Sequence, residues 1–235
     1  MTNFIWTRKP NFTNIKSINY NYYWQERGFA LNKKLKEREK IIFDLVPTKS
    51  DVLDVGCGNS LLPVSLKNKD CNVVVADISD EVLKGYSKFG INGIVIDLEK
   101  INKCIDNLKH YNYIILSEVL EHTKNPEEII TVLSKYTDNF IITVPNSAFY
   151  RYRLHLMFGG RFFTQWVYHP SEHLRFWSHI DFLDWLSVMN LSLIKAEASN
   201  GFSFFGSSSW LKNWWPNLFG HQIVYFCSVK NSNLS

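Results

Sequence analysis

Short apolar runs rich in β-branched residues alternate with helical stretches along the middle of the chain, and this alternation is the strongest constraint on the fold. The runs are apolar enough to be covered on both faces, which is typical of parallel strands flanked by helices. The pattern predicts an α/β fold with a seven-stranded, mostly parallel sheet and helices on both faces. The expected strands are residues 51–55, 72–77, 93–97, 111–117, 140–144, 191–198 and 222–229.

Helices are expected between these strands. Before the first strand, apolar residues recur among charges from 30 to 46, a pattern that predicts an amphipathic helix ending before Pro47. The helix that begins at Pro126 has a marked start, because Asn125 can cap it and Glu128 can complete a capping box. The other expected helices are residues 60–67, 80–88, 100–108 and 179–189.

Charge and cysteine usage narrow the class of protein. The formal charge of +4 is modest and its basic residues are spread along the chain, which does not support a nucleic-acid partner. The four cysteines lie far apart, without metal-ligand spacing or the density of a disulfide scaffold, which indicates a reducing compartment. With neither a signal region nor a run of about 20 apolar residues, we expect a cytoplasmic protein without a transmembrane segment.

The first expected strand runs into a glycine turn at Gly56-Cys57-Gly58, where missing side chains let a ligand approach the backbone. A dinucleotide fingerprint would need a third glycine at the position of Leu61, and a P-loop would need Gly-Lys-Ser or Gly-Lys-Thr. Neither is present. The turn therefore predicts a ligand site of another kind, preceded by the carboxylate of Asp54.

This stretch, Asp51-Val-Leu-Asp-Val-Gly-Cys-Gly-Asn59, resembles the first motif of class I methyltransferases, which have a Rossmann-like fold. Asp77 ends the next strand about 20 residues past the glycines, where an acid can accept both hydroxyls of a ribose. The resemblance implies that the chain binds S-adenosylmethionine and releases S-adenosylhomocysteine. The implied cofactor-binding residues are Asp54, Gly56 and Gly58 at the methionine part, Asp77 and Ile78 at the ribose, and Asp97 and Leu98 at the adenine, with Cys57 and Ser117 as further cofactor-binding residues.

An aromatic segment, Tyr22-Tyr-Trp-Gln-Glu-Arg27, precedes the first amphipathic helix. In related enzymes such a segment brings aromatic and Arg side chains over the cofactor, so Tyr23 and Arg27 are further cofactor-binding candidates. Arg27 can pair the methionine carboxylate through two hydrogen bonds. Alternatively, the segment only packs on the edge of the sheet.

The fourth expected strand ends in Ser117-Glu-Val-Leu-Glu-His122. If Glu118 to His122 form one helical turn, Glu118, Glu121 and His122 converge on one face, and a later segment, residues 171–178, adds His173. A divalent metal held by these four residues can lower the pKa of an acceptor hydroxyl. Alternatively, Glu118, His122 and His173 act as catalytic acid–base or acceptor-positioning groups without a metal.

These two segments resemble motifs of sugar-precursor methyltransferases, and Glu-x-x-Glu-His followed by a later His is similar to the metal site of small-RNA 2′-O-methyltransferases. Its first part is also similar to ubiquinone O-methyltransferases. A second resemblance covers more of the chain: residues 144–161 and 216–220 are similar to MetW, a methyltransferase-fold protein associated with methionine biosynthesis. The chain departs from MetW at the Glu-His pair.

Three functions follow from these resemblances. The first is O-methylation of a small acceptor, anionic or linked to a sugar or nucleotide, such as a polysaccharide building block. The second is a MetW-like accessory protein that activates an acyltransferase, and the third is a metal-dependent RNA 2′-O-methyltransferase.

One methyltransferase domain is expected over residues 1–235, since 46% hydrophobic content supports a single sizeable core. Residues 1–46 form its helical lid, 47–146 its cofactor-binding core, and 147–235 an acceptor-side insertion with the last helix and strands. Aromatic residues crowd 149–166 and 210–219. We expect these segments to pack on each other as a lid, to meet in a homodimer, or to wall the acceptor pocket beside basic residues such as Arg151, Arg153 and Arg175.

Overall fold

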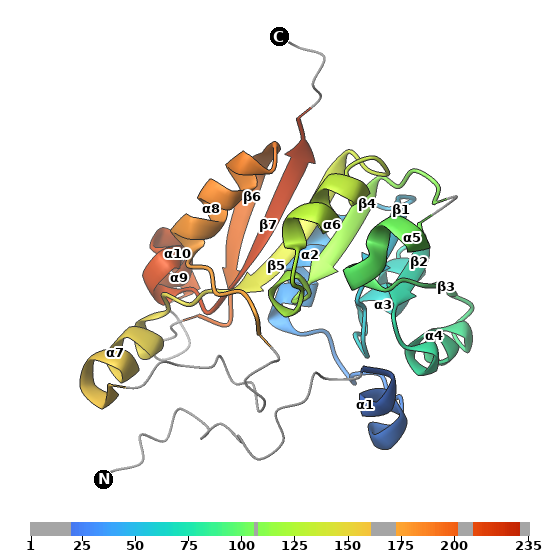
Figure 1. The fold of residues 1–235 in the computed structure, drawn as a ribbon, viewed down its shortest axis with the longest axis horizontal. Helices are drawn as coiled ribbons and strands as arrows, with labels where there is room; N and C mark the ends of the chain where they lie inside the picture. The colour runs from blue at the N-terminus through green and yellow to red at the C-terminus, as the bar shows by residue number, and fades with distance from the viewer. Residues whose placement is uncertain (1–19, 106–107, 161–172, 202–208, 231–235) are drawn as a thin grey trace.

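The computed structural model describes residues 20–105, 108–160, 173–201 and 209–230. Within them, seven strands form one sheet in the order β3-β2-β1-β4-β5-β7-β6 (Figure 1). The first five strands are parallel, and β7 runs antiparallel to both β5 and β6. The strands are β1 (Asp51–Val55), β2 (Asn72–Asp77), β3 (Asn92–Val95), β4 (Tyr113–Ser117), β5 (Asn139–Pro145), β6 (Leu191–Ser199) and β7 (Gln222–Val229).

Helices cover both faces of the sheet (Figure 1). The described helices are α1 (Tyr20–Arg27), α2 (Glu37–Leu45), α3 (Leu62–Asn68), α4 (Asp80–Ser87), α5 (Ile101–Cys104), α6 (Pro126–Leu133), α7 (Tyr150–Gly159), α8 (His179–Val188), α9 (Ser209–Trp214) and α10 (Pro216–Phe219), with short 3-10 turns at η1 (Leu98–Lys100) and η2 (Leu120–His122). None of the helices in these ranges is long and apolar enough to cross a membrane.

The two faces of the sheet bury separate hydrophobic cores. Alternate residues of one strand enter different cores: in β4, Ile114 and Leu116 pack with α5, α6 and α8, whereas Ile115 packs with α2, α3 and α4. All three side chains have no exposed surface. This two-sided burial explains why the central strands are apolar throughout, and it confirms the predicted α/β class.

The first amphipathic helix is shorter than predicted. Residues 28–36 are not helical, and α2 begins only at Glu37. The Asn32 backbone amide donates to the Asn59 carbonyl at 3.0 Å, and the Asn59 side-chain amide donates to the Ala30 carbonyl at 3.0 Å. These bonds tie the segment to the loop after β1 and replace the bonds that a longer helix would make.

Two details of other helices also differ from the prediction. The expected helix 100–108 is divided into η1 and α5, because the Asp97 carboxylate accepts the Glu99 amide at 3.1 Å and starts a tight turn. Residues 106–107 lie outside the described part. At α6, Asn125 makes no capping hydrogen bond to the helix backbone; its side-chain amide instead donates to Glu128 Oε2 at 2.9 Å, so the predicted capping box is wrong.

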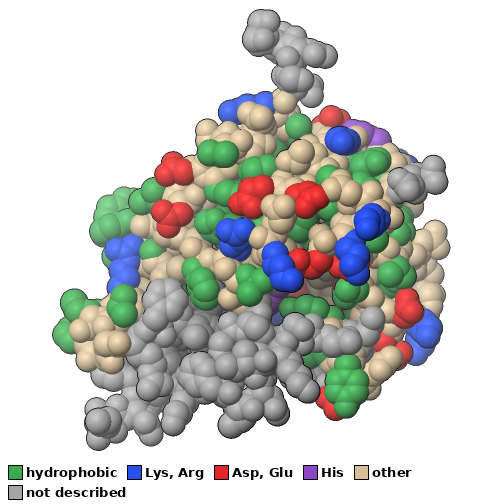
Figure 2. All heavy atoms as spheres, in the orientation of Figure 1, with side chains coloured by type: hydrophobic (Ala, Val, Ile, Leu, Met, Phe, Trp, Pro, Cys, Tyr) green, Lys and Arg blue, Asp and Glu red, His purple; other side chains and the backbone are tan. Residues whose placement is uncertain are grey.

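Charges of both signs are interspersed across the middle of the face that Figure 2 shows. Some oppositely charged side chains pair locally: Lys124 Nζ lies 3.9 Å from Glu99 Oε2, and Arg175 Nη2 lies 3.7 Å from Glu127 Oε2. On this face the described side chains therefore form no broad surface of one sign.

Candidate functional site

The glycine turn after β1 has the backbone conformation that its sequence predicts. Gly56 and Gly58 have φ angles of +68° and +50°, a region that favours glycine. The Gly56 amide donates to the Ala76 carbonyl at 2.7 Å, which joins the turn to β2. A Cβ atom on Gly56 would lie 2.6 Å from Val119 Cγ2, so the turn also packs closely against the segment after β4.

A cavity of about 310 Å³ opens at the carboxyl ends of β1, β2 and β4 and is partly covered by α1. Its walls are mostly apolar, with the carboxylates of Asp77, Asp97 and Glu118 at or just after the ends of β2, β3 and β4, and that of Glu99 in η1. Trp24 of α1 lies over the glycine turn, 3.4 Å from where a Cβ of Gly58 would be. The residues that line it are Tyr20, Tyr23, Trp24, Val55, Gly56, Gly58, Asp77, Ile78, Ile96, Asp97, Leu98, Glu99, Glu118, Val119, His122 and Thr123. We call it the apolar cavity.

Asp77 is held rigidly in the wall of the apolar cavity. Its Oδ2 accepts the Gly58 amide at 3.1 Å, and its Oδ1 accepts the Ser79 amide at 3.0 Å. Burial raises the pKa of Asp77, while the backbone hydrogen bonds from Ser79 and Gly58 oppose that rise. The carboxylate keeps lone pairs that can accept hydroxyl groups of a ligand.

A second, smaller cavity of about 160 Å³ adjoins the first. The two share Gly56, Gly58 and Glu118, so they meet at the glycine turn and at the end of β4. The smaller one is lined by side chains of both charges: Lys36, Arg38, Glu39, Asp54, Gly56, Cys57, Gly58, Asn59, Ser60, Leu62, Ser117 and Glu118. We call it the charged cavity.

The acids of the charged cavity are strongly desolvated. Burial raises the pKa of Asp54 well above its usual range, and the neighbouring carboxylates of Glu39 and Asp77 raise it further. Glu39 is satisfied within the protein, since it accepts the Lys36 amide at 2.8 Å and the Ser60 hydroxyl at 3.1 Å. A cation beside Asp54 would lower its pKa again, because an opposite charge favours the ionised form.

Arg38 supplies the guanidinium of the charged cavity from the first turn of α2. Its Nε lies 3.4 Å from Ser117 Oγ, and its Nη1 lies 3.4 Å from Gln222 Oε1. These long bonds hold the guanidinium beside the end of β4. A guanidinium in such a position can pair a ligand carboxylate.

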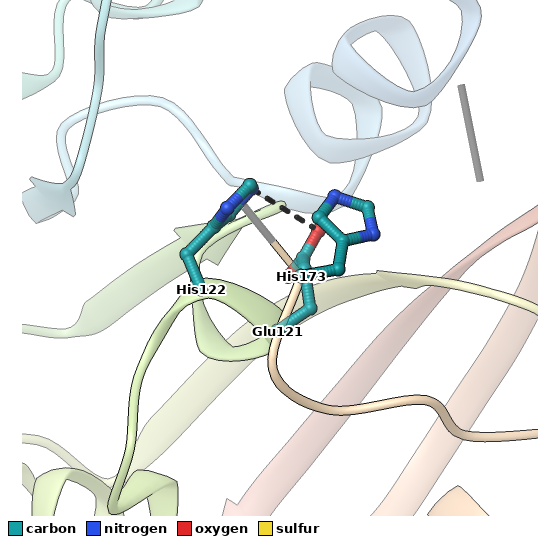
Figure 3. A group of neighbouring side chains, drawn as sticks. All are labelled: Glu121, His122 and His173. Atoms are coloured by element: carbon teal, nitrogen blue, oxygen red, sulfur yellow. Dashed lines mark ion pairs between the residues drawn. The ribbon is translucent and has the colours of Figure 1, made fainter. Parts of the chain in front are cut away.

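Glu121, His122 and His173 lie together as a third group (Figure 3), and His122 belongs to the lining of the apolar cavity. One potential ligand atom from each lies within 4.8 Å of the others. The rings of His122 and His173 are 4.6 Å apart at 81°, and His122 Nε2 lies 4.0 Å from Glu121 Oε1. Because only His122 lines the apolar cavity, it is the member of this triad that faces a ligand there.

The segment that carries His173 is fixed to the backbone of the triad itself. The amides of Leu174 and Arg175 donate to the Glu121 carbonyl at 2.7 and 3.2 Å, and Arg175 Nη2 donates to the Lys124 carbonyl at 2.6 Å. The structure therefore brings the two predicted segments together. It uses Arg175 to hold them there.

The electrostatics of the triad are those of a desolvated site. Burial raises the pKa of Glu121 well above its usual range, and the Glu118 carboxylate adds to the rise. Both carboxylate oxygens of Glu121 are buried without a hydrogen-bond partner among the described residues. Burial, with His122 as a second cause, lowers the pKa of His173 to about 3, so its ring is neutral at pH 7.

Glu118 is not a member of the group of three that the structure brings together, and the helical turn expected over residues 118–122 is wrong. The chain from Glu118 to His122 is not one helical turn, because Glu118 has a φ of +58° and only the last three residues form η2. The Glu118 carboxylate accepts the Gln222 amide at 2.7 Å and lies 3.4 Å from the Thr143 hydroxyl. It therefore lies between the two cavities.

The predicted cofactor residues lie along the two cavities. Five of them line the apolar cavity only, three line the charged cavity only, and the two glycines line both. The residues that line only the apolar cavity are Tyr23, Asp77, Ile78, Asp97 and Leu98. Those that line only the charged cavity are Asp54, Cys57 and Ser117, and the two shared glycines are Gly56 and Gly58. Arg27 ends α1, and its side chain lies outside the described part of the structure.

The wall residues that sequence reasoning did not single out include Tyr20, Trp24, Lys36, Arg38 and Glu39. Lys36, Arg38 and Glu39 were not singled out because the first amphipathic helix was expected to start at residue 30, which put them inside the helix instead of at its beginning. Glu39 accepts the Lys36 backbone amide as the Glu of a capping box does, but Lys36 has no acceptor of its own, so position 36 carries no Ser, Thr, Asp or Asn that would have marked the start of α2.

Two other basic candidates, Arg151 and Arg153, make hydrogen bonds within residues 147–235, the segment expected on the acceptor side. Arg153 donates to the carbonyls of Ala148 at 2.5 Å and Asn217 at 3.2 Å, and Arg151 Nε donates to the Tyr150 hydroxyl at 3.1 Å. The described aromatic rings of α7 and α10 do meet, with Tyr150 and Phe219 6.2 Å apart. Residues 161–172, which carry the rest of the predicted aromatic segment, lie outside the described part.

The sheet order, the glycine turn and the strand-end acids define the class I methyltransferase fold. Solved structures agree. Magnesium protoporphyrin IX methyltransferase from Synechocystis PCC 6803, crystallised with bound SAH, has a TM-score of 0.54 at 14% identity, over 82% of this chain and 80% of that chain. A TehB-like SAM-dependent methyltransferase from Corynebacterium glutamicum has a TM-score of 0.54 at 14% identity, over 89% and 94%.

Within this class, the family model of methionine biosynthesis protein MetW matches residues 36–227, and the chain belongs to the MetW family. A bifunctional methionine biosynthesis protein MetXA/MetW from Rhodopirellula baltica is 26% identical over 65% of this chain. A ubiquinone biosynthesis O-methyltransferase from Rickettsia conorii is 34% identical over 43% of it. The matched regions are 27% and 35% of the lengths of these two relatives.

Proposed function

We propose that the protein is an S-adenosylmethionine-dependent methyltransferase that methylates an oxygen of a small-molecule acceptor. The observation that carries this proposal is the pair of adjoining cavities. One is apolar with acids at its strand ends, the other carries charges of both signs, and they meet at the glycine turn. S-adenosylmethionine has the same division into an adenosine half and a zwitterionic amino-acid half.

The apolar cavity suits adenosine. Asp77, fixed by two backbone amides, is placed to accept the ribose hydroxyls. Asp97 and Leu98 line the same cavity farther along the sheet edge, where the adenine would lie. This is the place expected for a ligand of an open α/β sheet, across the carboxyl ends of its strands.

The charged cavity suits the amino-acid half. Arg38 and Lys36 can pair the carboxylate, and Asp54 and Glu118 can accept the ammonium group. Glu118 lies at the junction of the cavities, where the sulfonium would be. Binding a cation there offsets part of the cost of desolvating buried carboxylates.

His122 faces the apolar cavity from its acceptor side, and we propose that it and His173 align the acceptor and receive or direct its proton. The methyl donor is already a strong electrophile, so alignment and proton removal are the protein's remaining tasks. His173 is neutral at pH 7 because its pKa is lowered to about 3. It can therefore accept a hydrogen bond or ligate a metal at that pH.

We further propose that Glu121, His122 and His173 hold a divalent ion. The residues fit such an ion, because Glu121 has two buried oxygens without a hydrogen-bond partner among the described residues and lies beside two imidazoles. Mixed carboxylate and imidazole donors suit manganese, iron or zinc. When bound, the ion would lower the pKa of an acceptor hydroxyl.

Metal dependence has its own test. Exhaustive chelation should suppress methyl transfer, and one added divalent ion should restore it. Elemental analysis of the purified protein should find the metal, and Glu121→Gln should reduce its content. Undiminished transfer after chelation, with no metal found, would leave the two histidines as acid–base or positioning groups.

For the acceptor we propose a hydroxyl compound linked to a sugar or nucleotide, of the kind used to build surface polysaccharides. The resemblance to sugar-precursor methyltransferases supports this choice. Labelled methyl transfer from S-adenosylmethionine to fractionated small molecules of the native cell tests the proposed activity. The expected result is a labelled small molecule whose formation requires His122.

An accessory role is the second candidate, because the chain belongs to the MetW family and one relative is a fusion of MetXA with MetW. In that case the protein would bind an acyltransferase and raise its activity, with or without His122. Pull-down from the native cell followed by an acyltransferase assay distinguishes the two functions. We prefer the enzyme because the triad lies beside the cofactor cavities.

A further inference from the structure

Gln222, the first residue of β7, connects two side chains that belong to the cavity walls. Its Nε2 donates to Glu118 Oε2 at 2.7 Å, and its Oε1 lies 3.4 Å from Arg38 Nη1. The same Oε1 accepts the Asn200 side-chain amide at 2.7 Å. β7 lies between β5 and β6, so this amide reaches the site from the antiparallel edge of the sheet.

Gln222 itself is not a wall residue. Among the described residues that line the two cavities, Arg38 belongs to the charged cavity and Glu118 to both, whereas Gln222 belongs to neither. Any effect of Gln222 on a ligand must therefore pass through the two charged side chains that it contacts.

The chemistry of the amide suits this place. A glutamine offers a donor and an acceptor on one planar group, so it can bond a carboxylate and a guanidinium at the same time. Burial raises the pKa of Glu118, whereas Arg38 and the bond from Gln222 lower it. With the amide between them, the two opposite charges stay apart enough for each to face a ligand instead of collapsing onto the other.

Asn200, which donates to the Gln222 side chain, is itself held in place by a second hydrogen bond. Asn200 has a φ of +50°, and its backbone amide donates to Glu37 Oε2 at 2.7 Å. Glu37 is the first residue of α2, next to Arg38, and it also pairs with Lys212 of α9. The start of α2 is thus tied to the ends of β6 and β7 on the side of the charged cavity.

We propose that Gln222 is a positioning residue that orients Glu118 and Arg38 toward the amino-acid half of the cofactor. It therefore sets affinity for that half and leaves affinity for the adenosine half unchanged. The inference rests on the proposed function, since it assumes that S-adenosylmethionine occupies both cavities.

The experiment compares two ligands that share the adenosine half. S-adenosylhomocysteine carries the amino acid, and 5′-methylthioadenosine lacks it. Calorimetry with Gln222→Met, which keeps the length of the side chain, should show roughly 10-fold weaker binding of S-adenosylhomocysteine, the scale of a lost hydrogen bond to a charged group. Affinity for 5′-methylthioadenosine should stay within about 2-fold, because no contact of the adenosine half changes.

Two further variants complete the test. Asn139→Met removes an amide at the opposite end of the same β5–β7 pair, where its Nδ2 donates to the Asn112 carbonyl at 3.2 Å, and both ligands should bind as they do to the unchanged protein. Asn200→Gly keeps the left-handed backbone but removes the bond to Gln222. It should weaken S-adenosylhomocysteine alone, by about 3-fold, and it serves as the test if Gln222→Met is unstable.

The outcomes separate this inference from the proposed function. If the unchanged protein binds neither ligand, the proposed function is wrong and the inference falls with it. If the unchanged protein binds both, but Gln222→Met weakens both equally or neither, the proposed function stands and the positioning role is wrong. Selective loss of S-adenosylhomocysteine supports the inference.

Discussion

The two regions proposed as the cofactor side and the acceptor side of this site are built differently. On the cofactor side, all the predicted residues with described side chains except Tyr23 of α1 lie at the carboxyl ends of β1 to β4 or in the turns after them, and each lines a cavity. On the acceptor side, the triad joins the turn after β4 to a segment about 50 residues later, and the link is a set of backbone bonds to Glu121.

The difference shows which chemistry a sheet can impose. Parallel strands bring their carboxyl ends to one edge of the sheet. Acids at those ends therefore lie close together, independently of the conformation of the loops. Residues inside a loop depend on the dihedral angles of single residues. Glu118 illustrates this, because its φ of +58° directs its carboxylate away from the triad that its spacing predicted.

The largest expected effect tests whether the two sides are separable. His122→Ala should reduce methyl transfer more than about 100-fold, the lower range for loss of an acid–base group. Affinity for S-adenosylhomocysteine should change by less than about 5-fold, since one apolar-cavity contact is lost. Transfer rates and calorimetry on the same preparation measure both. Equal loss of binding and transfer would contradict the division into two sides.

The cofactor side should be the less tolerant of added atoms. Gly56→Ala combines a left-handed φ with a Cβ atom 2.6 Å from Val119, and it should lower the free energy of unfolding by about 2–4 kcal/mol. Gly28→Ala is the matched control, because Gly28 has the same φ of +68° and nothing within 4 Å. It should cost about 1–2 kcal/mol, the backbone part alone. Urea unfolding compares them, and equal costs would mean that the turn has room for a side chain.

The acceptor side should respond more to pH. His173 has a pKa of about 3 when folded against 6.5 when unfolded, so below 6.5 the unfolded state takes up a proton that the folded state refuses. Stability from this group is therefore full above pH 6.5 and is lost as pH falls toward 3, with about 2 kcal/mol lost at pH 5. His173→Gln should remove that part of the pH dependence of unfolding. If the free energy of unfolding of His173→Gln depends on pH between 7 and 5 just as that of the unchanged protein does, then His173 is not buried as a neutral ring.

The smallest expected effect concerns α6, the helix that follows Glu121 and His122, and α8, the helix that follows His173. At α8, Ser178 Oγ accepts the Asp181 amide at 3.1 Å, so Ser178→Ala should cost about 1 kcal/mol. At α6, Asn125 makes no bond to the helix backbone, so Asn125→Ala should cost less than about 0.5 kcal/mol. Thermal unfolding of both variants measures the difference. A loss of stability in Asn125→Ala as large as that in Ser178→Ala would show that Asn125 caps α6 as the sequence predicted.

Much of the fold could be predicted because its signals are local. The apolar strands, their alternation with helices, and the glycine turn all appear within short windows of sequence, and the sheet bears them out. The start of α2 could not be read in this way. The apolar period continues through Leu31 and Leu35, whereas the backbone of that segment is bonded to the loop at Asn59.

The candidate site divides along the same line. Asp77 and Asp97 could be predicted because Asp77 ends β2 and Asp97 lies two residues after the end of β3, and both line the apolar cavity. Arg38 and Gln222 could not, because they reach the charged cavity or its wall from elements distant in sequence, through contacts 79 to 184 residues apart. Only the packed sheet places them together.

The most direct test of the central claim is a calorimetric titration of S-adenosylhomocysteine into the unchanged protein and into Asp77→Ala. The account predicts saturable binding to the unchanged protein. It also predicts a loss of about 1–3 kcal/mol of binding free energy in the variant, because the ribose hydroxyls and the amides of Gly58 and Ser79 lose their carboxylate partner. No heat of binding for the unchanged protein, with NAD or ATP binding instead, would contradict it.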